Sequence, residues 1–135
     1  MLIITIDGPS GVGKGTLALN LVQELKLNYL NSGSIYRSIA YIAEINSIDL
    51  NNTKELINIG SSIIFNIKPN THKVDIIYEN KTINNFIFNE ETAKIASKIS
   101  SNKTLRLSLV SIQRSFAKEP GLIAEGRDMG SVIFP

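Results

Sequence analysis

The chain contains no cysteine, no tryptophan and no long hydrophobic run. The lack of cysteine excludes disulfide bonds, zinc–thiolate sites and cysteine nucleophiles, and it suits a reducing compartment. No apolar stretch approaches the roughly 18 residues that a membrane helix needs. The apolar start at residues 2–6 lacks the basic flank and the length of a signal peptide. We therefore expect a soluble cytoplasmic protein with no membrane partner.

The residues that are present describe an ordinary globular chain. Its 135 residues are 43% hydrophobic and 19% charged. This length fits one compact domain, and the composition excludes collagen-like, coiled-coil and wholly disordered chains. A net charge of +2 is too small to indicate a nucleic-acid partner. Composition alone therefore identifies no ligand.

Arginine is scarce, with four residues against ten lysines. The chain evidently uses lysine where any surface cation suffices, whereas a planar guanidinium can grip an oxyanion through two parallel hydrogen bonds. The arginines are therefore candidates for anion contacts, with ordinary surface placement as the alternative. They are Arg37, Arg106, Arg114 and Arg127.

Hydrophobic periodicity predicts strands that alternate with helices. Apolar or β-branched runs predict buried strands at residues 2–6, 27–30 and 122–124. Helical spacing predicts a helix from about residue 14, in which Leu17, Leu21 and Leu25 form one apolar stripe with Ala18 and Val22 beside them. After a loop at 31–34, further helices are predicted around residues 35–42 and from Thr53, which is the expected N-cap.

The pattern changes after residue 60. Residues 63–67 and 74–79 predict a β-hairpin, and a third strand is predicted near 83–88. Helical patterns then return at 92–100 and 102–118. The middle of the chain therefore reads as a small β-rich insert between helical segments.

The most informative stretch is Gly8-Pro-Ser-Gly-Val-Gly-Lys-Gly-Thr16, between a predicted strand and a predicted helix. Its glycines allow backbone amides to converge on one anion, and the positive end of the helix points at the same place. Lys14 can reach the β- and γ-phosphates of ATP, and Thr16 offers a hydroxyl to Mg²⁺. The predicted phosphate-binding residues are Gly8, Pro9, Ser10, Gly11, Val12, Gly13, Lys14, Gly15 and Thr16.

This loop departs from the general phosphate-loop pattern, in which Ser or Thr follows the lysine directly. Here Gly15 follows Lys14, and the hydroxyl comes one residue later. An Asn-Lys-x-Asp guanine motif is also missing, since the tetrapeptides that begin at Asn80 and Asn102 lack the aspartate. The Gly-Lys-Gly-Thr form resembles the loop of nucleoside monophosphate kinases rather than that of GTPases.

Three segments resemble bacterial cytidylate kinases in the same order: residues 6–16, Asn31-Ser-Gly-Ser-Ile-Tyr-Arg37 and Ile123-Ala-Glu-Gly-Arg-Asp-Met-Gly130. The resemblance implies a three-layer α/β/α P-loop NTPase fold whose parallel sheet is incomplete in this chain. Residues 1–31 and 118–135 would form the P-loop core. Residues 32–117 would form the CMP-binding domain, with its β-rich insert at about 63–90. The chain would cover a little more than the front half of such an enzyme, without the mobile lid and its arginines.

The resemblance also implies roles for single residues. Lys14, Arg127 and Asp128 match catalytic positions, and Asp128 can accept a hydrogen bond from the cytosine amino group that uracil lacks. The residues that match CMP-binding positions are Ser32, Arg37, Ser97, Arg106, Arg127 and Asp128. The family's usual Arg and Pro are absent from Phe88-Asn-Glu-Glu91.

Glu125 follows the strand predicted at 122–124. There it could hold Mg²⁺ through water, together with Thr16, or it could be a simple carboxylate on a turn. Both interpretations stay open at this point.

The resemblance as a whole implies a monomeric enzyme of pyrimidine nucleotide metabolism. It would transfer a phosphoryl group from ATP, with Mg²⁺, to CMP or dCMP. One alternative is a truncated, inactive chain that still binds nucleotide phosphates. Another is a P-loop kinase for a different small acceptor.

Overall fold

The structure is a computed structural model that describes residues 1–9 and 13–135. Ser10, Gly11 and Val12 of the predicted phosphate loop lie outside the described residues. The chain divides into two compact units. The first comprises Met1–Ser32, Ile67–Val74 and Ser111–Pro135, and the second comprises Gly33–Asn66 and Asp75–Val110.

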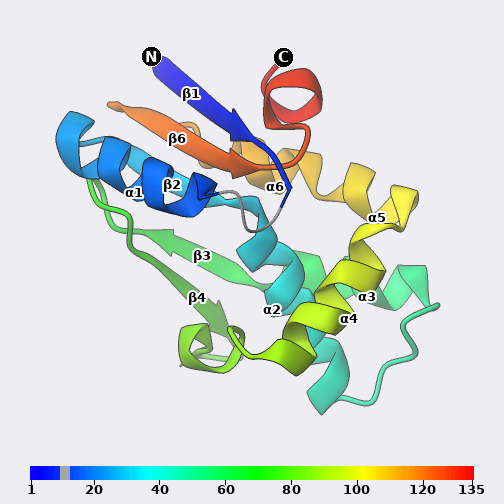
Figure 1. The fold of residues 1–135 in the computed structure, drawn as a ribbon. Coiled ribbons are helices and arrows are strands. Elements are labelled where there is room, and N and C mark those ends of the chain that lie inside the picture. The colour runs from blue at the N-terminus through cyan, green and yellow to red at the C-terminus, as the bar shows by residue number, and fades with distance from the viewer. Residues whose placement is uncertain (10–12) are drawn as a thin grey trace. The chain divides into compact units, whose positions relative to one another are not determined.

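The first unit is built on three parallel strands in the order β1-β6-β2 (Figure 1). β6 lies in the centre, and all of its residues are buried. An almost continuous apolar run is what a parallel strand covered on both faces requires. The strands are β1 (Leu2–Asp7), β2 (Asn28–Asn31) and β6 (Gly121–Gly126), close to the ranges that the sequence predicts.

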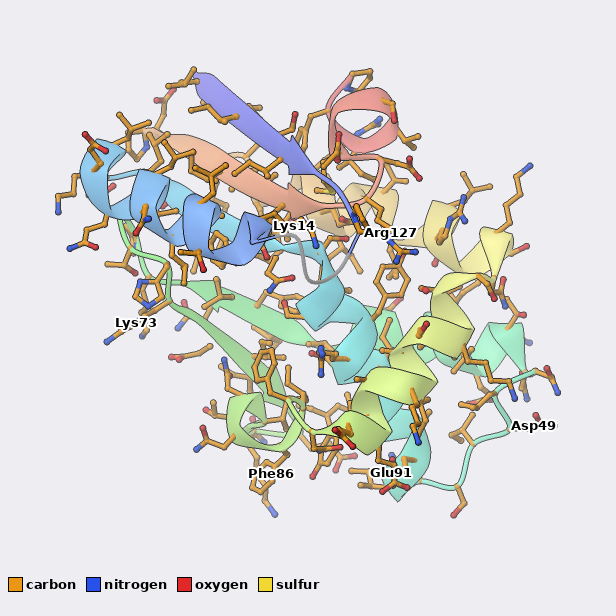
Figure 2. All side chains as sticks on the ribbon, in the orientation of Figure 1. Lys14, Asp49, Lys73, Phe86, Glu91 and Arg127 are labelled. Atoms are coloured by element: carbon orange, nitrogen blue, oxygen red, sulfur yellow. The ribbon has the colours of Figure 1, made fainter. Side chains whose placement is uncertain are left out.

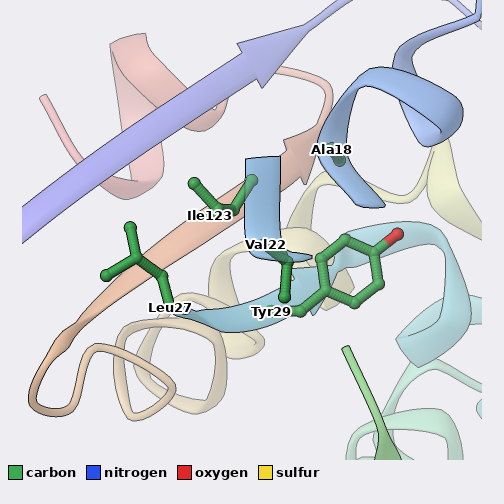
Figure 3. Packing of buried hydrophobic residues seen from close by; sticks show 5 residues of the cluster. All are labelled: Ala18, Val22, Leu27, Tyr29 and Ile123. Carbon is green, nitrogen blue, oxygen red and sulfur yellow. The ribbon is translucent and has the colours of Figure 1, made fainter. Parts of the chain in front are cut away.

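Helix α1 (Lys14–Leu25) covers one face of this sheet. Its contact with the sheet runs through Ala18 and Val22, which pack with Tyr29 and Ile123 (Figure 3). Ala18, Leu21 and Val22 of the predicted apolar stripe pack toward the sheet. Leu17 and Leu25, which the prediction also placed in the stripe, are 50% and 43% exposed. Leu17 lies about 100° around the helix from Ala18 and therefore beside the buried face, whereas Leu25 is exposed at the last residue of the helix.

The opposite face of β6 is also covered. Leu122 and Ala124 alternate with Ile123 along the strand and are fully buried. Burial of both faces of a parallel sheet confirms the predicted α/β class of a P-loop NTPase fold.

The single helix predicted at 102–118 is wrong. The chain forms α5 (Lys103–Ser108) and α6 (Val110–Arg114) instead, and Leu109 between them is the C-cap of α5. The hydroxyl of Ser108 donates to the carbonyl of Leu105 at 2.6 Å, and the hydroxyl of Ser115 donates to that of Ile112. Serine side chains that compete for backbone carbonyls weaken a helix, and a helical pattern of apolar residues does not reveal this effect.

The second unit contains three longer helices, a small sheet of order β3-β4-β5 and a 3-10 turn. Tyr41 and Phe86 stack in this unit with ring centroids 5.8 Å apart. Besides α5, the elements of this unit are α2 (Ser32–Ile45), α3 (Thr53–Ser62), α4 (Glu90–Ser100), β3 (Ile64–Ile67), β4 (Val74–Tyr78), β5 (Lys81–Thr82) and the turn η1 (Asn84–Phe86).

Three local predictions in this region are corrected by the structure. The loop expected at 31–34 is wrong, because α2 already begins at Ser32. The N-cap of α3 is Asn52, not Thr53, and its side chain accepts a hydrogen bond from the Glu55 amide. The third strand expected at 83–88 is only β5, since the side chain of Asn84 accepts from the Ile76 amide at 2.8 Å and the chain then turns.

Throughout the described part of the chain, the helices are too short or too polar to cross a membrane.

Candidate active site

Three strands of the first unit end at one edge. Asp7 pairs with Gly126 and Asn31 pairs with Glu125, so the carboxyl ends of the strands are level. The Gly8 amide donates to the Gly126 carbonyl at 3.2 Å and continues this alignment beyond β1. Ligands of open parallel sheets bind at the carboxyl ends of the strands. The residues that follow β1, β6 and β2 are therefore candidates for one site.

Lys14 lies at this edge, as the first residue of α1. Gly13 precedes it in a left-handed conformation, with φ of 84°, which glycine adopts without strain. The Lys14 ammonium donates to the Pro9 carbonyl at 3.3 Å, back across the loop. Figure 2 shows Lys14 and Arg127 beyond the ends of β1 and β6.

Glu125 lies inside β6 rather than after it, which corrects the prediction of a strand that ends at residue 124. Its side chain is only 6% exposed. A Cβ atom placed on Gly15 would be 3.7 Å from both carboxylate oxygens. The carboxylate therefore lies against the first turn of α1, beside the glycine that departs from the general loop pattern.

The two oxygens of the Glu125 carboxylate have different surroundings. Oε2 is buried and accepts no hydrogen bond from any described residue. Burial raises the pKa of Glu125, while a hydrogen bond from Tyr29 and the charge of Lys14 act in the opposite direction. An unpartnered buried carboxylate oxygen is costly unless something else binds it.

Tyr29 and Asn31 are site residues that the sequence analysis missed. Burial raises the pKa of Tyr29 far above its ordinary value, and the Glu125 carboxylate raises it further, so the phenol stays protonated and donates. The Asn31 side chain in turn donates to the Tyr29 oxygen. A signal was present, since Tyr29 and Asn31 are alternate residues of one strand and share its face.

Asp7 is a third site residue that the sequence analysis missed. Its carboxylate accepts from the Met129 amide at 2.6 Å and from the Gly130 amide at 3.0 Å. These amides begin the π-helical turn η2 (Met129–Ile133), directly after Asp128, whose φ is 58°. Asp7 thus fixes the backbone from which the side chains of Arg127 and Asp128 project.

Ser32 packs against the end of β6. A Cβ atom on Gly126 would lie 2.7 Å from the Cβ of Ser32 and 3.1 Å from the sulfur of Met129. Only glycine fits this close approach, which explains its place before Arg127. Ser32 is buried at the same edge as Glu125 and Asp7.

The other predicted CMP-binding residues lie in the second unit. Arg37, on α2, donates from Nη1 to the Ile87 carbonyl at 3.1 Å. Its guanidinium carbon lies 5.5 Å from the centre of the Phe88 ring, a cation–π geometry. Ser97 on α4 and Arg106 on α5 are both exposed. Their roles stay predictions.

Arg114 has a structural role in the first unit. Its Nε donates to the Ile133 carbonyl at 2.9 Å, and its Nη2 donates to the Val132 carbonyl at 3.2 Å. This guanidinium therefore holds the end of η2 in place.

The residues present fit a magnesium ion that arrives with a nucleotide. Among the described residues, no three acidic or histidine side chains gather as a metal cage. Mg²⁺ bound with a nucleotide needs only one or two carboxylates, because phosphates and water supply the remaining ligands. The unpartnered Oε2 of Glu125, beside the helical turn that carries Thr16, is suited to such an ion.

Comparison with known proteins identifies the family. The sequence model described as "Cytidylate kinase" matches residues 4–135. The chain belongs to the cytidylate kinase family. This finding confirms the resemblance seen in the three motifs.

Several curated cytidylate kinases are similar to the chain. That of Aliivibrio salmonicida (strain LFI1238) is 39% identical over 132 residues, which are 98% of this chain and 59% of that protein. Cytidylate kinase 1 of Haemophilus influenzae is 40% identical over 134 residues, 99% of this chain and 58% of the relative. The cytidylate kinase of Azotobacter vinelandii is 40% identical over 136 residues, with 99% and 59% covered. The chain thus spans a little under three fifths of the length of these relatives.

Proposed function

We propose that this protein transfers the γ-phosphoryl group of ATP to CMP or dCMP and gives CDP or dCDP. The family match across residues 4–135 carries the proposal. The arrangement of Lys14, Glu125 and Arg127 at the carboxyl end of β6 supports it, because phosphoryl transfer depends on positioning and on neutralisation of charge.

On the donor side, the loop and the first turn of α1 would bind the ATP phosphates. The proposed residues are Gly8 to Thr16, of which Ser10, Gly11 and Val12 lie outside the described part. The ammonium of Lys14, which donates to the neutral Pro9 carbonyl, can exchange this partner for phosphate oxygens at little cost. The N-terminal amides of α1 add further donors.

Mg²⁺ is the metal that we propose. Thr16 would hold it through the hydroxyl, and Glu125 would hold it through a water at Oε2. When bound, the ion neutralises charge on the β- and γ-phosphates. The protein's own contribution is a carboxylate kept buried against the first turn of α1.

On the acceptor side, we assign CMP recognition to Ser32, Arg37, Ser97 and Arg106. Arg127 would contact phosphate, and Asp128 would accept a hydrogen bond from the cytosine amino group. No side-chain nucleophile is needed, since an oxygen of the CMP phosphate attacks the γ-phosphorus in line and the bond to the β-phosphate oxygen breaks.

The test is an ADP-coupled assay with ATP, Mg²⁺ and a panel of acceptors: CMP, dCMP, UMP, AMP and shikimate. We expect turnover with CMP or dCMP well above that with the other acceptors. Preference for a different acceptor would overturn the substrate assignment. Binding of ATP without any turnover would show a nucleotide-binding protein that is not a kinase.

A further inference from the structure

Beneath the first turn of α1, Tyr29 and Glu125 form a buried polar pair whose tyrosine has no part in the reaction as proposed above. The Tyr29 ring packs in the hydrophobic cluster with Val22, Leu27 and Ile123 (Figure 3). Its hydroxyl reaches the Glu125 carboxylate. Phenylalanine would fill the same space among these apolar neighbours, so packing alone does not account for the hydroxyl.

The pair leaves one carboxylate oxygen satisfied and the other unsatisfied. Since Oε2 accepts no hydrogen bond from the described residues, the tyrosine donates to Oε1. The Tyr29 oxygen is itself fixed by the Asn31 side chain. This chain of donors leads from β2 across to β6, where Asn31 and Glu125 are register partners.

The orientation of the Glu125 carboxylate depends on the hydrogen bonds that lead from Asn31 through Tyr29, because its other neighbours do not fix it. Ile6, its register partner on β1, offers only an apolar side chain. Gly15 on α1 has no side chain, and Lys14 contributes its charge. Among the side chains that the structure describes, Tyr29 is therefore the hydrogen-bond donor to this carboxylate.

We infer that Tyr29 is a positioning residue that holds Oε1 of Glu125 and thereby presents Oε2 to the hydrated Mg²⁺ of ATP. The inference rests on the proposed function. Partners that orient the groups around a metal are worth about 10- to 100-fold in metal affinity or activity. Tyr29 therefore acts on the metal-dependent part of ATP binding and leaves the contacts to the phosphates alone unchanged.

The test compares ATP affinity with Mg²⁺ and with EDTA, measured by calorimetry on the 135-residue chain. Tyr29→Phe deletes only the hydroxyl, and Tyr78→Phe is the matched control, since its hydroxyl accepts from Asn46 in the second unit. We expect the gain in ATP affinity that Mg²⁺ gives to fall about tenfold in Tyr29→Phe, with the affinity in EDTA unchanged. Tyr78→Phe should keep the wild-type ratio.

Each other outcome has a definite meaning. If Tyr29→Phe keeps the wild-type ratio, or loses affinity equally in both buffers, the positioning role is wrong. It is also wrong if Mg²⁺ gives no gain in the wild type. Failure of the wild type to bind ATP in either buffer would instead overturn the proposed function. If Tyr29→Phe does not fold, Asn31→Ala should lower the same ratio by removing the donor to the Tyr29 oxygen, and an unchanged ratio would refute the inference.

Discussion

At the scale of single residues, Lys14 makes only a weak hydrogen bond within the protein. Its ammonium is bound to a neutral carbonyl at 3.3 Å. We expect Lys14→Ala to lower kcat for CMP about 100- to 1,000-fold, the usual effect of removing one donor to a transition-state anion. The melting temperature should change little, because the hydrogen bond that Lys14 donates to Pro9 is exposed.

The control for this prediction is Lys54→Ala, which removes an exposed lysine from α3. Both variants are measured in the coupled assay and by thermal unfolding. Wild-type kcat in Lys14→Ala would contradict the donor-site assignment, and a large loss in Lys54→Ala would point to a nonspecific effect of charge.

Glu125 illustrates how a site can reduce stability. Burial raises its pKa in the folded chain, so the folded state binds a proton more tightly than the unfolded state. The tighter proton binding stabilises the folded state, and this stabilisation is fully present below the ordinary glutamate pKa of about 4.3. It is lost as pH rises through the raised pKa of Glu125. Glu125→Gln removes the charge and should flatten this decline.

Urea unfolding at several pH values checks the prediction. We expect Glu125→Gln to be more stable than the wild type at pH 8, with a difference that shrinks toward pH 4. Parallel stability curves for the two proteins would be incompatible with a raised pKa. Because Glu125 is also the proposed metal-side carboxylate, the same variant should bind ATP with a smaller gain from Mg²⁺.

At the scale of elements, the contact between α2 and the segment after η1 fixes the position of the Arg37 guanidinium. The Ile87 carbonyl and the Phe88 ring both contact its guanidinium. We expect Phe88→Ala to raise KM for CMP several-fold while kcat changes little, because the loss of a cation–π contact worth about 0.5–1 kcal/mol lets Arg37 move.

Phe86→Ala is the matched control. It removes another exposed phenylalanine from the same turn, but this ring stacks on Tyr41 rather than on Arg37. Steady-state kinetics with CMP separate the two variants. An equal rise of KM in both would show that the turn as a whole, not the guanidinium contact, affects the acceptor.

The elements that the sequence predicts well are those whose pattern lies within one segment. β1, α1 and β6 have clear apolar runs or periods, and the structure confirms them. The long helix at 102–118 fails because serine hydroxyls compete for its backbone carbonyls. The strand at 83–88 fails because one asparagine side chain replaces a strand partner.

The same distinction applies to the candidate site. The phosphate-loop motif can be found in the sequence because its residues are contiguous, and Lys14 begins its helix as expected, while the phosphate-binding role of the motif stays a prediction. The contacts of Tyr29 with Glu125 and of Asp7 with Met129 and Gly130 depend on which strands are neighbours. Only the sheet order β1-β6-β2 brings these residues together, and no local pattern contains that order.

At the scale of the whole molecule, Asn28 joins segments that are far apart in the sequence. Its amide nitrogen donates to the carbonyls of Lys118 and Glu119 at 3.0 and 3.3 Å, and its oxygen accepts from the Asn70 amide at 3.1 Å. Asn28 is buried, so Asn28→Ala removes three hydrogen bonds that water does not easily replace. The Lys118 carbonyl keeps the Gly121 amide as a donor, whereas the Glu119 carbonyl and the Asn70 amide lose their Asn28 partner. We expect a loss of about 2 kcal/mol in the free energy of unfolding.

Urea unfolding followed by circular dichroism measures this loss. Asn58→Ala, at an exposed position of α3, should change stability by less than about 0.5 kcal/mol. Equal stability of Asn28→Ala and the wild type would mean that water replaces all three hydrogen bonds.

The central position of β6 has a consequence for biosynthesis. Both neighbours of β6 precede it in the chain, and they pair with it rather than with each other. A ribosome must therefore translate residues 32–120 after β2 before either earlier strand has a partner, which takes roughly 4 to 18 seconds at about 5–20 residues per second. During that time the apolar segments of the nascent polypeptide stay unpaired, so chaperones that bind exposed hydrophobic chains have their longest opportunity before Gly121 emerges.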